Sequence, residues 1–446
     1  MDHSLLKYVP GFIRNKLEGR EVLQKTIANT GWLFTDHVLR MGVGFFVIIW
    51  VARYLGPEQF GIYNYAIAFV ALFSAIATLG LENIVVRNIV EDPESANEIL
   101  GTAFILKIIG GVLALCLTIG IIFIVRPEDN LTRWMVGIIA FGMLFQAFDA
   151  IDFWFQSQVL SKYTVYAKNT SFLIASILKM GLILLHAPLI AFAWIVLAEF
   201  AMGAIGMVIV YRINGLYMLD FKVGFRQTRE LLKDSWPLIF SGVFVLVNMQ
   251  IDKVMIGEIS GDIEVGIYSA ASRLSELWYF IPVVVGASVA PVLVREKSRI
   301  DSVYHIQLQK TYSFMTMIAL FCTIPITFFS KSIIYIIFGT DYSAASHILS
   351  VHIWSAIFVF HVSIRSKALI IEGLQNFIAV YAFFTMTSNV IFNLFLIPNH
   401  GGIGAAYASL LSWMLSVLFM PCFSRKTIKS VQMFFKSFNL FFLKAS

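Results

Sequence analysis

Twelve long apolar runs constrain this chain more than any other feature of its sequence. A helix that crosses a bilayer needs about 20 consecutive, mostly apolar residues, and each run reaches that length. We expect transmembrane helices at residues 31–53, 62–84, 99–125, 134–157, 165–186, 188–211, 236–256, 266–293, 311–338, 346–371, 376–397 and 401–421. The runs are continuous and do not alternate, which favours helices over a β-barrel, the other architecture able to span a membrane.

Charged residues are scarce in this sequence. They make up 13% of the 446 residues, whereas soluble globular proteins carry roughly 25%. A chain this long with so little charge cannot cover itself with a surface that faces water. The sequence therefore predicts an all-α, polytopic protein of about twelve transmembrane helices.

The Lys and Arg residues of the loops predict the orientation. They concentrate in the N-terminal segment, the 212–235 loop, the 295–310 loop and the C-terminal tail, which all lie on one side if there are twelve spans. The turns on the other side are nearly free of bases, apart from Arg126 and Arg133. Because cytoplasmic loops carry the excess of Lys and Arg, we expect both termini to be cytoplasmic.

An internal repeat divides the chain into halves of six spans. The motif G-x4-G-I-Y occurs at 56–63, before the second span, and at 261–268, before the eighth. Transporters commonly bind substrate between two such repeats; a duplicated scaffold without a transport role is the alternative. We expect a cytoplasmic amphipathic N-terminal segment at 1–30, an N-lobe at 31–211, a cytoplasmic linker at 212–235, a C-lobe at 236–421 and a basic amphipathic cytoplasmic tail at 422–446.

The tail mixes Lys with Phe between residues 424 and 443. This composition is typical of an amphipathic helix that lies in the membrane interface. A partly ordered basic tail would have the same composition, so both interpretations stay open.

Six bases and six acids lie within the apolar runs. They are Asp36, Arg40, Lys107, Asp149, Asp152, Lys168, Lys179, Glu199, Asp252, Lys253, Arg273 and Glu276. A charge at the centre of a bilayer costs about 2.5–3.5 kcal/mol on insertion scales, so such groups face water or a partner. We therefore expect a hydrated central cavity of mixed charge. Asp36 and Arg40 are four residues apart and share a helix face, so they also fit a structural ion pair.

Several function classes lack their motifs. The phosphate-binding loop G-x4-G-K-[ST] does not occur, so ATP is not expected to drive this chain. The three cysteines are scattered and suggest neither a disulfide framework nor a metal site. The basic loops indicate membrane orientation and not nucleic-acid binding. We expect no catalytic residue, no metal and no cofactor.

Seven short segments resemble those of a known family. They are Asn29–Phe34, Val51–Pro57, Phe60–Tyr63, Ser235–Leu238, Ile251–Gly257, Gly266–Ala271 and a seventh made up of Ile397-Pro398, Gly401-Gly402 and Gly404–Ala406. Their order and spacing are similar to those of the Wzx-type O-antigen and polysaccharide flippases. That family belongs to the MOP superfamily, which also holds the MATE exporters and the lipid II flippase.

The resemblance implies a MATE-like fold of two six-helix lobes around a central cavity. It implies a substrate of oligosaccharide linked to undecaprenyl pyrophosphate, such as an O-antigen or a similar surface polysaccharide repeat unit. This substrate would be flipped across the bacterial inner membrane. Membrane lipids and other polysaccharide assembly proteins are the further partners that the resemblance suggests.

Candidate site residues follow from the charges and from this resemblance. The candidate cavity cations for the anionic substrate are Arg40, Lys107, Lys179, Lys253 and Arg273. The candidates for coupling to an H⁺ or Na⁺ gradient are Asp36, Asp149, Asp252 and Glu276. By position, Arg40, Lys253 and Arg273 are the cations that match the family.

Two other functions compete with the flippase. A MATE-like, cation-coupled multidrug exporter would depend on acids in the cavity, where a flippase depends on bases. A membrane enzyme such as a glycan polymerase is disfavoured, because the predicted periplasmic loops are too short to hold a catalytic domain.

Overall fold

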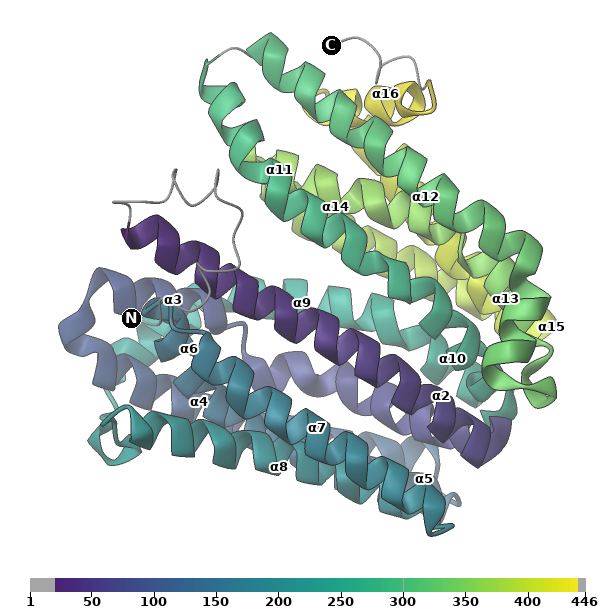
Figure 1. The fold of residues 1–446 in the computed structure, drawn as a ribbon, viewed down its shortest axis with the longest axis horizontal. Helices are drawn as coiled ribbons and strands as arrows, with labels where there is room; N and C mark the ends of the chain where they lie inside the picture. The colour runs from purple at the N-terminus through teal and green to yellow at the C-terminus, as the bar shows by residue number, and fades with distance from the viewer. Residues whose placement is uncertain (1–20, 300, 440–446) are drawn as a thin grey trace. The chain divides into compact units, whose positions relative to one another are not determined.

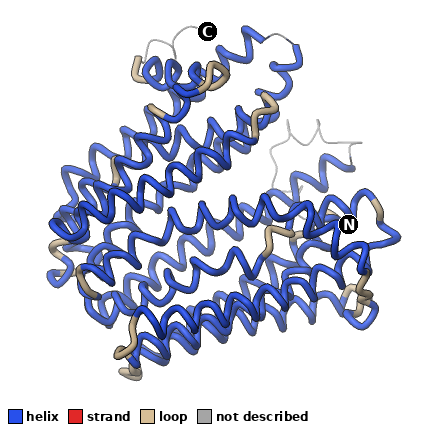
Figure 2. Tube along the Cα trace, turned by 180° about the vertical axis from the view of Figure 1, so that it is seen from behind, coloured by secondary structure: helices blue, strands red, loops and turns tan. Residues whose placement is uncertain are grey.

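The computed structural model describes residues 21–299 and 301–439, and within those ranges every long element is an α-helix and no strand occurs. Figures 1 and 2 show the helices running nearly parallel or antiparallel to their neighbours within each part of the chain. The predicted all-α fold is confirmed.

Ten helical stretches in the described residues are long and apolar enough to cross a membrane. Two of them, Phe34–Glu91 with 58 residues and Asn376–Phe423 with 48, are each more than twice the needed length of about 20 residues. Both contain a break at a glycine with positive φ, at Gly56 (φ 67°) and at Gly401 (φ 55°). A non-glycine residue rarely adopts such a conformation. Each long stretch therefore holds two of the predicted spans, which agrees with about twelve crossings.

The chain forms two compact units. Unit 1 contains the described residues up to Val51 together with Phe73–Phe240, and unit 2 contains Ala52–Leu72 and the described residues from Ser241 onward. The segment Ala52–Leu72, which lies in the first half of the sequence, thus belongs to the second unit.

Unit 1 is built around a small apolar core at one end of its helices. Leu81, Val85 and Leu100 are fully buried there. Its elements are α2 (Glu21–Thr78) without Ala52–Leu72, α3 (Glu82–Glu91), η2 (Pro93–Ser95), α4 (Ala96–Val125), α5 (Asn130–Phe141), η3 (Gly142–Phe148), α6 (Asp149–Ser157), α7 (Lys162–Leu184), α8 (Leu189–Ile213), η4 (Met218–Asp220) and the start of α9 (Phe225–Ile259).

Unit 2 has an apolar core where α11, α12 and α14 pack together (Figure 1). Tyr304, Met315 and Phe360 are fully buried in it. Its further elements are α10 (Asp262–Glu276), η5 (Leu277–Tyr279), α11 (Phe280–Arg299), α12 (Asp301–Phe338), η6 (Thr340–Tyr342), α13 (Ala345–His352), α14 (Ser355–Ile371), α15 (Asn376–Leu418), η7 (Met420–Phe423) and α16 (Ile428–Ser437).

The two G-x4-G-I-Y motifs pack against each other within unit 2. Gly61 of the first motif lies against the backbone of Asp262, and Gly266 of the second lies against the backbone of Pro57. The repeat seen in the sequence is therefore also a contact in the fold, made by equivalent positions of the two halves.

Two of the predicted spans are interrupted by short 3₁₀ segments. The fourth span consists of α5, the seven-residue η3 and α6, and the eighth consists of α10, η5 and α11. Runs of 3₁₀ helix longer than three or four residues are uncommon and mark strain or a hinge. In the eighth span the break comes just before Pro282, which has no N–H to donate to the carbonyl of Trp278 and crowds that carbonyl.

The tail forms a packed helix, α16. Phe434 is 4% exposed against the unit 2 core, whereas Phe435 is 61% exposed. Gln309 of α12 donates to the carbonyl of Met433, and the hydroxyls of Thr316 and Ser437 lie 2.6 Å apart. The described tail is thus amphipathic and docked on its own lobe. The N-terminal segment up to residue 20 and the tail beyond Asn439 lie outside the described residues.

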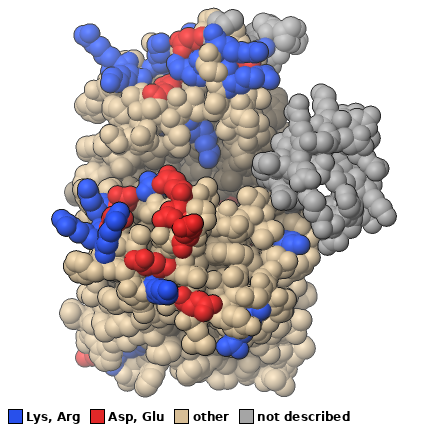
Figure 3. All heavy atoms as spheres, turned by 90° about the vertical axis from the view of Figure 1, so that its left-hand side faces the viewer, with Lys and Arg blue, Asp and Glu red and all other residues tan. Residues whose placement is uncertain are grey.

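Two contacts bring the predicted cytoplasmic segments together at one end of unit 1. The Arg87 guanidinium of α3 lies 2.8 Å from the Asp234 carboxylate of α9, and the Lys222 N–H donates to the carbonyl of Asn97. Figure 3, which views the left-hand side of Figure 1, shows Lys and Arg gathered together with Asp and Glu on that face.

Candidate functional site

A cluster of two lysines and two aspartates lies inside unit 1. The Nζ of Lys107 on α4 is 3.4 Å from Asp149, and the Nζ of Lys168 on α7 is 3.0 Å from Asp149 and 2.9 Å from Asp152. The side chain of Lys107 is only 2% exposed and also lies over the ring of Phe153. The cluster has no net charge.

The 3₁₀ segment η3 positions the acids of this cluster. Helix α6 begins directly after it, so Asp149 and Asp152 both lie in the first turn of α6. A negative charge at a helix N-terminus is favoured by the helix dipole. The interruption in the fourth span therefore presents two carboxylates where two lysines from neighbouring helices can reach them.

The remaining intramembrane charges of unit 1 also form pairs. The Nε of Arg40 lies 2.8 Å from Asp36, and the Nζ of Lys179 lies 3.2 Å from Glu199. The predicted cations Arg40, Lys107 and Lys179 are therefore each next to a carboxylate. The Lys179–Glu199 pair joins α7 to α8, whereas Asp36 and Arg40 both lie on α2 and pair within that helix.

In unit 2, Asp252 of α9 lies in a cage of neutral hydrogen-bond donors. One carboxylate oxygen accepts from Asn393 at 2.7 Å, and the other accepts from Tyr268 at 2.6 Å and from Ser409 at 2.5 Å. Asp252 is 5% exposed. The charge is thus dispersed over hydrogen bonds and not neutralised by a base in the cage.

Two oxygens beside Asp252 are also available to a ligand. The Oδ1 of Asn393 is buried without a hydrogen-bond partner. The Oδ1 of Asn389 accepts from the Nδ2 of Asn393 at 3.2 Å and keeps a second lone pair. Carboxylate, amide and hydroxyl oxygens are the ligands that hard cations prefer. The cage can therefore hold a proton on Asp252 or a small hard cation among these oxygens.

Lys253 is the neighbour of Asp252 and points elsewhere. It is 5% exposed, and its Nζ donates to Gln250 at 3.1 Å. Among the residues that the structure describes, no carboxylate oxygen lies within 4 Å of the Nζ of Lys253. Arg273 and Glu276 of α10 are near enough to act on Lys253 electrostatically; Arg273 is exposed and Glu276 is half-buried. Unit 2 thus brings together Asp252, Lys253, Arg273 and Glu276.

Asn389, Asn393, Ser409 and Tyr268 were not among the sequence candidates. A signal for them was present, since Asn389 and Asn393 are polar residues four apart in an apolar span and therefore share a helix face. The sequence candidates were chosen by charge, which these side chains lack. Only the fold shows that α9, α10 and α15 meet at Asp252.

The histidines and cysteines form no metal site in the described part of the chain, where no group of three His, Cys, Asp or Glu side chains could hold an ion. His352 and His361 are both buried, but they bond to different partners. His352 lies 2.6 Å from the Ser275 hydroxyl, and His361 lies 3.1 Å from that of Thr316.

Comparison with known proteins decides the family. The family model described as "Polysaccharide biosynthesis protein" matches residues 26–297. The chain belongs to this family. A second model, MatE, matches residues 237–395 of this polysaccharide biosynthesis protein.

Curated relatives cover nearly the whole chain at low identity. The capsular polysaccharide biosynthesis protein CapF of Staphylococcus aureus is 20% identical over 412 residues, which cover 88% of this chain and 97% of CapF. The probable low-salt glycan biosynthesis flippase Agl15 of Haloferax volcanii is 23% identical over 412 residues, which cover 86% of this chain and 80% of Agl15.

Solved structures show the same fold. An inward-facing multidrug resistance MATE family transporter of the MOP superfamily matches with a TM-score of 0.70 and 14% identity, covering 94% of this chain and 99% of the other. The lipid II flippase MurJ matches with a TM-score of 0.68 and 17% identity, covering 94% and 93%. The expected resemblance and MATE-like fold are confirmed, and the protein is a multi-pass membrane protein.

Proposed function

We propose that this protein is a flippase for an oligosaccharide linked to undecaprenyl pyrophosphate, such as an O-antigen or a similar surface polysaccharide repeat unit. The family, the named glycan flippase among its relatives and the lipid II flippase fold support this function. The observation that carries the proposal is Lys253, a buried base with no carboxylate within ion-pair distance among the described residues.

A base of this kind suits an anionic substrate. Burying an unpaired charge is costly, so a protein keeps one where a ligand supplies the opposite charge for part of its cycle. A pyrophosphate forms strong, charge-assisted hydrogen bonds with Lys and Arg. Lys253 and the exposed Arg273 of the same unit are the groups that we assign to it, with Arg40, Lys107 and Lys179 as further candidates that must first leave their carboxylates.

We assign energy coupling to Asp252. Its cage of Tyr268, Asn393 and Ser409 offers a place for H⁺ or Na⁺ beside Lys253. Loss of the negative charge of Asp252 on ion binding would change the field at Lys253, and this links the ion to the pyrophosphate. Asp36, Asp149 and Glu276 remain further candidates for coupling.

The flippase proposal is tested in a host that lacks its own copy of the gene. The unaltered protein is expected to restore surface glycan, and Lys253→Gln is expected to leave it absent while lipid-linked repeat units accumulate on the cytoplasmic leaflet. Lys253→Arg keeps the charge and should retain part of the activity. Lys331→Gln, at an exposed lysine near the end of α12, is the matched control and should restore glycan fully.

Normal glycan with Lys253→Gln would overturn the assigned role of Lys253. Normal glycan in the deletion host itself would overturn the proposed substrate class. Protein levels in the membrane fraction separate both outcomes from loss of folding.

A cation-coupled multidrug exporter is the second candidate, because the MatE model matches residues 237–395. Such an exporter would bind cationic drugs through acids in place of bases. Deletion would then raise drug sensitivity and leave surface glycan unchanged. Lys253→Gln would not reduce drug resistance, whereas Glu276→Gln would.

We further propose that the protein lies in a bacterial inner membrane with both termini in the cytoplasm, where it also meets other polysaccharide assembly proteins. The loop bases support this orientation. Reporter fusions after Ile213 and after Asn439 are expected to be active only as cytoplasmic reporters. An active periplasmic reporter at either position would reverse the orientation.

A further inference from the structure

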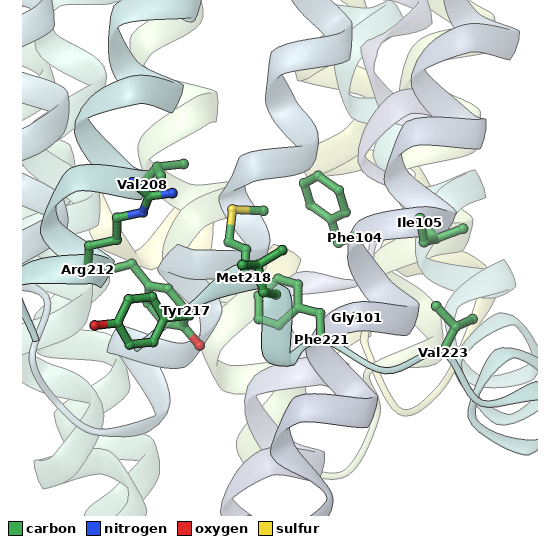
Figure 4. A pocket seen from close by; sticks show the side chains of 11 residues that line it. Gly101, Phe104, Ile105, Val208, Arg212, Tyr217, Met218, Phe221 and Val223 are labelled. Atoms are coloured by element: carbon green, nitrogen blue, oxygen red, sulfur yellow. The ribbon is translucent and has the colours of Figure 1, made fainter. Parts of the chain in front are cut away.

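A pocket of about 370 Å³ opens in unit 1 between α4, the end of α8 and the linker that follows it. Ligand pockets in proteins have volumes of this order. Figure 4 shows Arg212 and Tyr217 on one side, Ile105 and Val223 on the other, and the side chains of Phe104 and Met218 between them. The lining is apolar except at Arg212 and at the two tyrosines, Tyr211 and Tyr217.

The linker is fixed to α4, which makes the pocket a built feature. The Lys222 N–H donates to the carbonyl of Asn97 at 3.2 Å, and the Gly224 N–H donates to the Thr102 hydroxyl at 3.1 Å. Gly101 permits this close approach, since a Cβ there would lie 2.3 Å from the carbonyl oxygen of Lys222. Behind the linker, the rings of Phe104 and Phe221 lie 6.2 Å apart and form the floor.

The mouth of the pocket joins surfaces that face hydrocarbon. Ile105 and Ile109 on α4 are exposed, as is Ile209 on α8, and these helices are membrane spans. The linker itself exposes Leu219 to 92% and Phe225 to 88%. Exposed large apolar side chains next to basic ones are typical of a segment that lies at the boundary of headgroups and acyl chains.

Two bases, Arg212 and Lys222, lie at the mouth of the pocket. Arg212 lines the pocket from the last turn of α8, and in the described residues no carboxylate lies within ion-pair distance of it. Lys222 follows in the linker and is exposed, and the acid Asp220, also exposed, lies two residues before it. Bases at the cytoplasmic surface of a membrane attract anionic lipid headgroups.

We propose that this pocket binds an anionic phospholipid of the predicted cytoplasmic leaflet, with part of one acyl chain among Phe104, Val208 and Met218 and the phosphate at Arg212. The lining of the pocket contains none of the bases that we assign to the pyrophosphate of the transport substrate, and this favours a phospholipid as its ligand.

The site is tested by native mass spectrometry of the full chain, purified in mild detergent and exchanged into nanodiscs with equal amounts of phosphatidylglycerol and phosphatidylethanolamine. The unaltered protein is expected to retain one phosphatidylglycerol on detergent release. Ile105→Trp, which fills the mouth, is expected to reduce this occupancy at least tenfold. Its control is Ile109→Trp, one turn along the same exposed face of α4 and outside the pocket, which should retain the lipid.

The role of the Arg212 charge in lipid selection is tested separately. Arg212→Gln is expected to reduce the preference for phosphatidylglycerol about fivefold, the effect of one base near a lipid surface. Arg226→Gln is the control, because Arg226 is paired with Glu230 at 2.9 Å and does not line the pocket. Size-exclusion profiles of all variants confirm folding.

Three outcomes would overturn the proposal. Equal retention by Ile105→Trp and Ile109→Trp would show annular lipid only. Equal loss in Arg212→Gln and Arg226→Gln would show a diffuse charge effect without a site. If the unaltered protein retains a polyprenyl phosphate from the expression host and Ile105→Trp does not, the pocket belongs to the transport substrate. None of these outcomes depends on the proposed transport activity.

Discussion

Gly61 and Gly266 occupy equivalent places in the two repeats and each lies directly against the other's helix. A Cβ on Gly61 would lie 1.7 Å from the carbonyl oxygen of Asp262, and a Cβ on Gly266 would lie 1.9 Å from that of Pro57. Because the obstructing atoms belong to backbone, a side-chain movement cannot relieve either clash. The two helices can approach this closely only if both positions are glycine.

Alanine at either glycine is therefore expected to destabilise unit 2. Overpacking of a tight contact costs about 1–3 kcal/mol, and we expect Gly61→Ala and Gly266→Ala to lie at the upper end or beyond it. Thermal unfolding in detergent measures the effect. Gly120→Ala is the control, since a Cβ there meets no atom within 4 Å; equal melting temperatures for all three variants would refute the close contact.

The two aspartates of the unit 1 cluster are expected to differ in importance. Asp149→Asn leaves Lys107 without a carboxylate, whereas Asp152→Asn leaves both lysines next to Asp149. Breaking a buried pair costs about 3–5 kcal/mol, so Asp149→Asn should lower the melting temperature and the membrane level far more than Asp152→Asn. The reverse order would mean that Lys107 does not depend on Asp149.

The ion cage is tested at Asn393. If Na⁺ binds there, adding it should raise the melting temperature of the protein, because a ligand of the folded state stabilises that state. Asn393→Ala should remove this rise, and choline should not produce it. If the coupling ion is H⁺, Na⁺ has no effect and Asn393→Ala instead reduces transport driven by a pH gradient.

Asn399 gives the matched control for the cage. It lies on the same helix, is exposed and bonds only within the helix, to the carbonyl of Phe395. Asn399→Ala should keep both the Na⁺ effect and the transport. Unchanged coupling in Asn393→Ala would exclude the cage as the coupling site.

The tail helix α16 is expected to stabilise unit 2 through one residue. Phe434 is buried and Phe435 is mostly exposed. Replacing a buried Phe by Ala costs about 3–5 kcal/mol, so Phe434→Ala should lower the melting temperature strongly and Phe435→Ala only slightly. Equal effects would indicate that α16 does not dock where the structure has it.

The stability of the fold is expected to depend on the ionisation of Asp129, which lies outside the membrane spans. Burial alone would raise its pKa, but hydrogen bonds from Thr132 and Arg126 outweigh burial and lower it. A lowered pKa in the folded state stabilises the fold above the unfolded-state value of about 3.9, and this stabilisation is lost as the pH falls through the folded-state pKa.

Asp129→Asn separates this effect from helix capping. The Asp129 side chain caps α5 by accepting from the Thr132 N–H, and asparagine caps equally well. The melting temperature of the unaltered protein should exceed that of Asp129→Asn at pH 6 and lose this advantage below about pH 4. A constant difference across that range would contradict the assignment.

Sequence reasoning predicted the elements of this fold well, because membrane spans depend on local composition. The long runs and the turn at Gly56 follow from the residues themselves. The seven-residue η3 was not predicted, since nothing in residues 142–148 differs from an ordinary apolar helix. The packing around it could not be predicted either: Phe200 of α8 lies against Gly142, where a Cβ would be 2.6 Å from the Phe200 ring.

The site was harder to predict than the fold. Sequence identified the charged residues, but Lys107 and Asp149 are 42 residues apart, and only the packing of α4 against α6 shows that they pair. The same holds for Asp252, whose partner Asn393 is 141 residues away. The roles in substrate binding and ion coupling assigned to these residues stay predictions.

The placement of Ala52–Leu72 in unit 2 has a consequence for biogenesis. The packing surface of Gly61 is supplied by residues that the ribosome makes about two hundred positions later. During synthesis this segment enters the bilayer before its partner helix exists, so that its small-residue face is covered only by lipid. The second half, expressed alone, would have a vacant groove along α10, so the two halves should mature only as one polypeptide or when co-expressed.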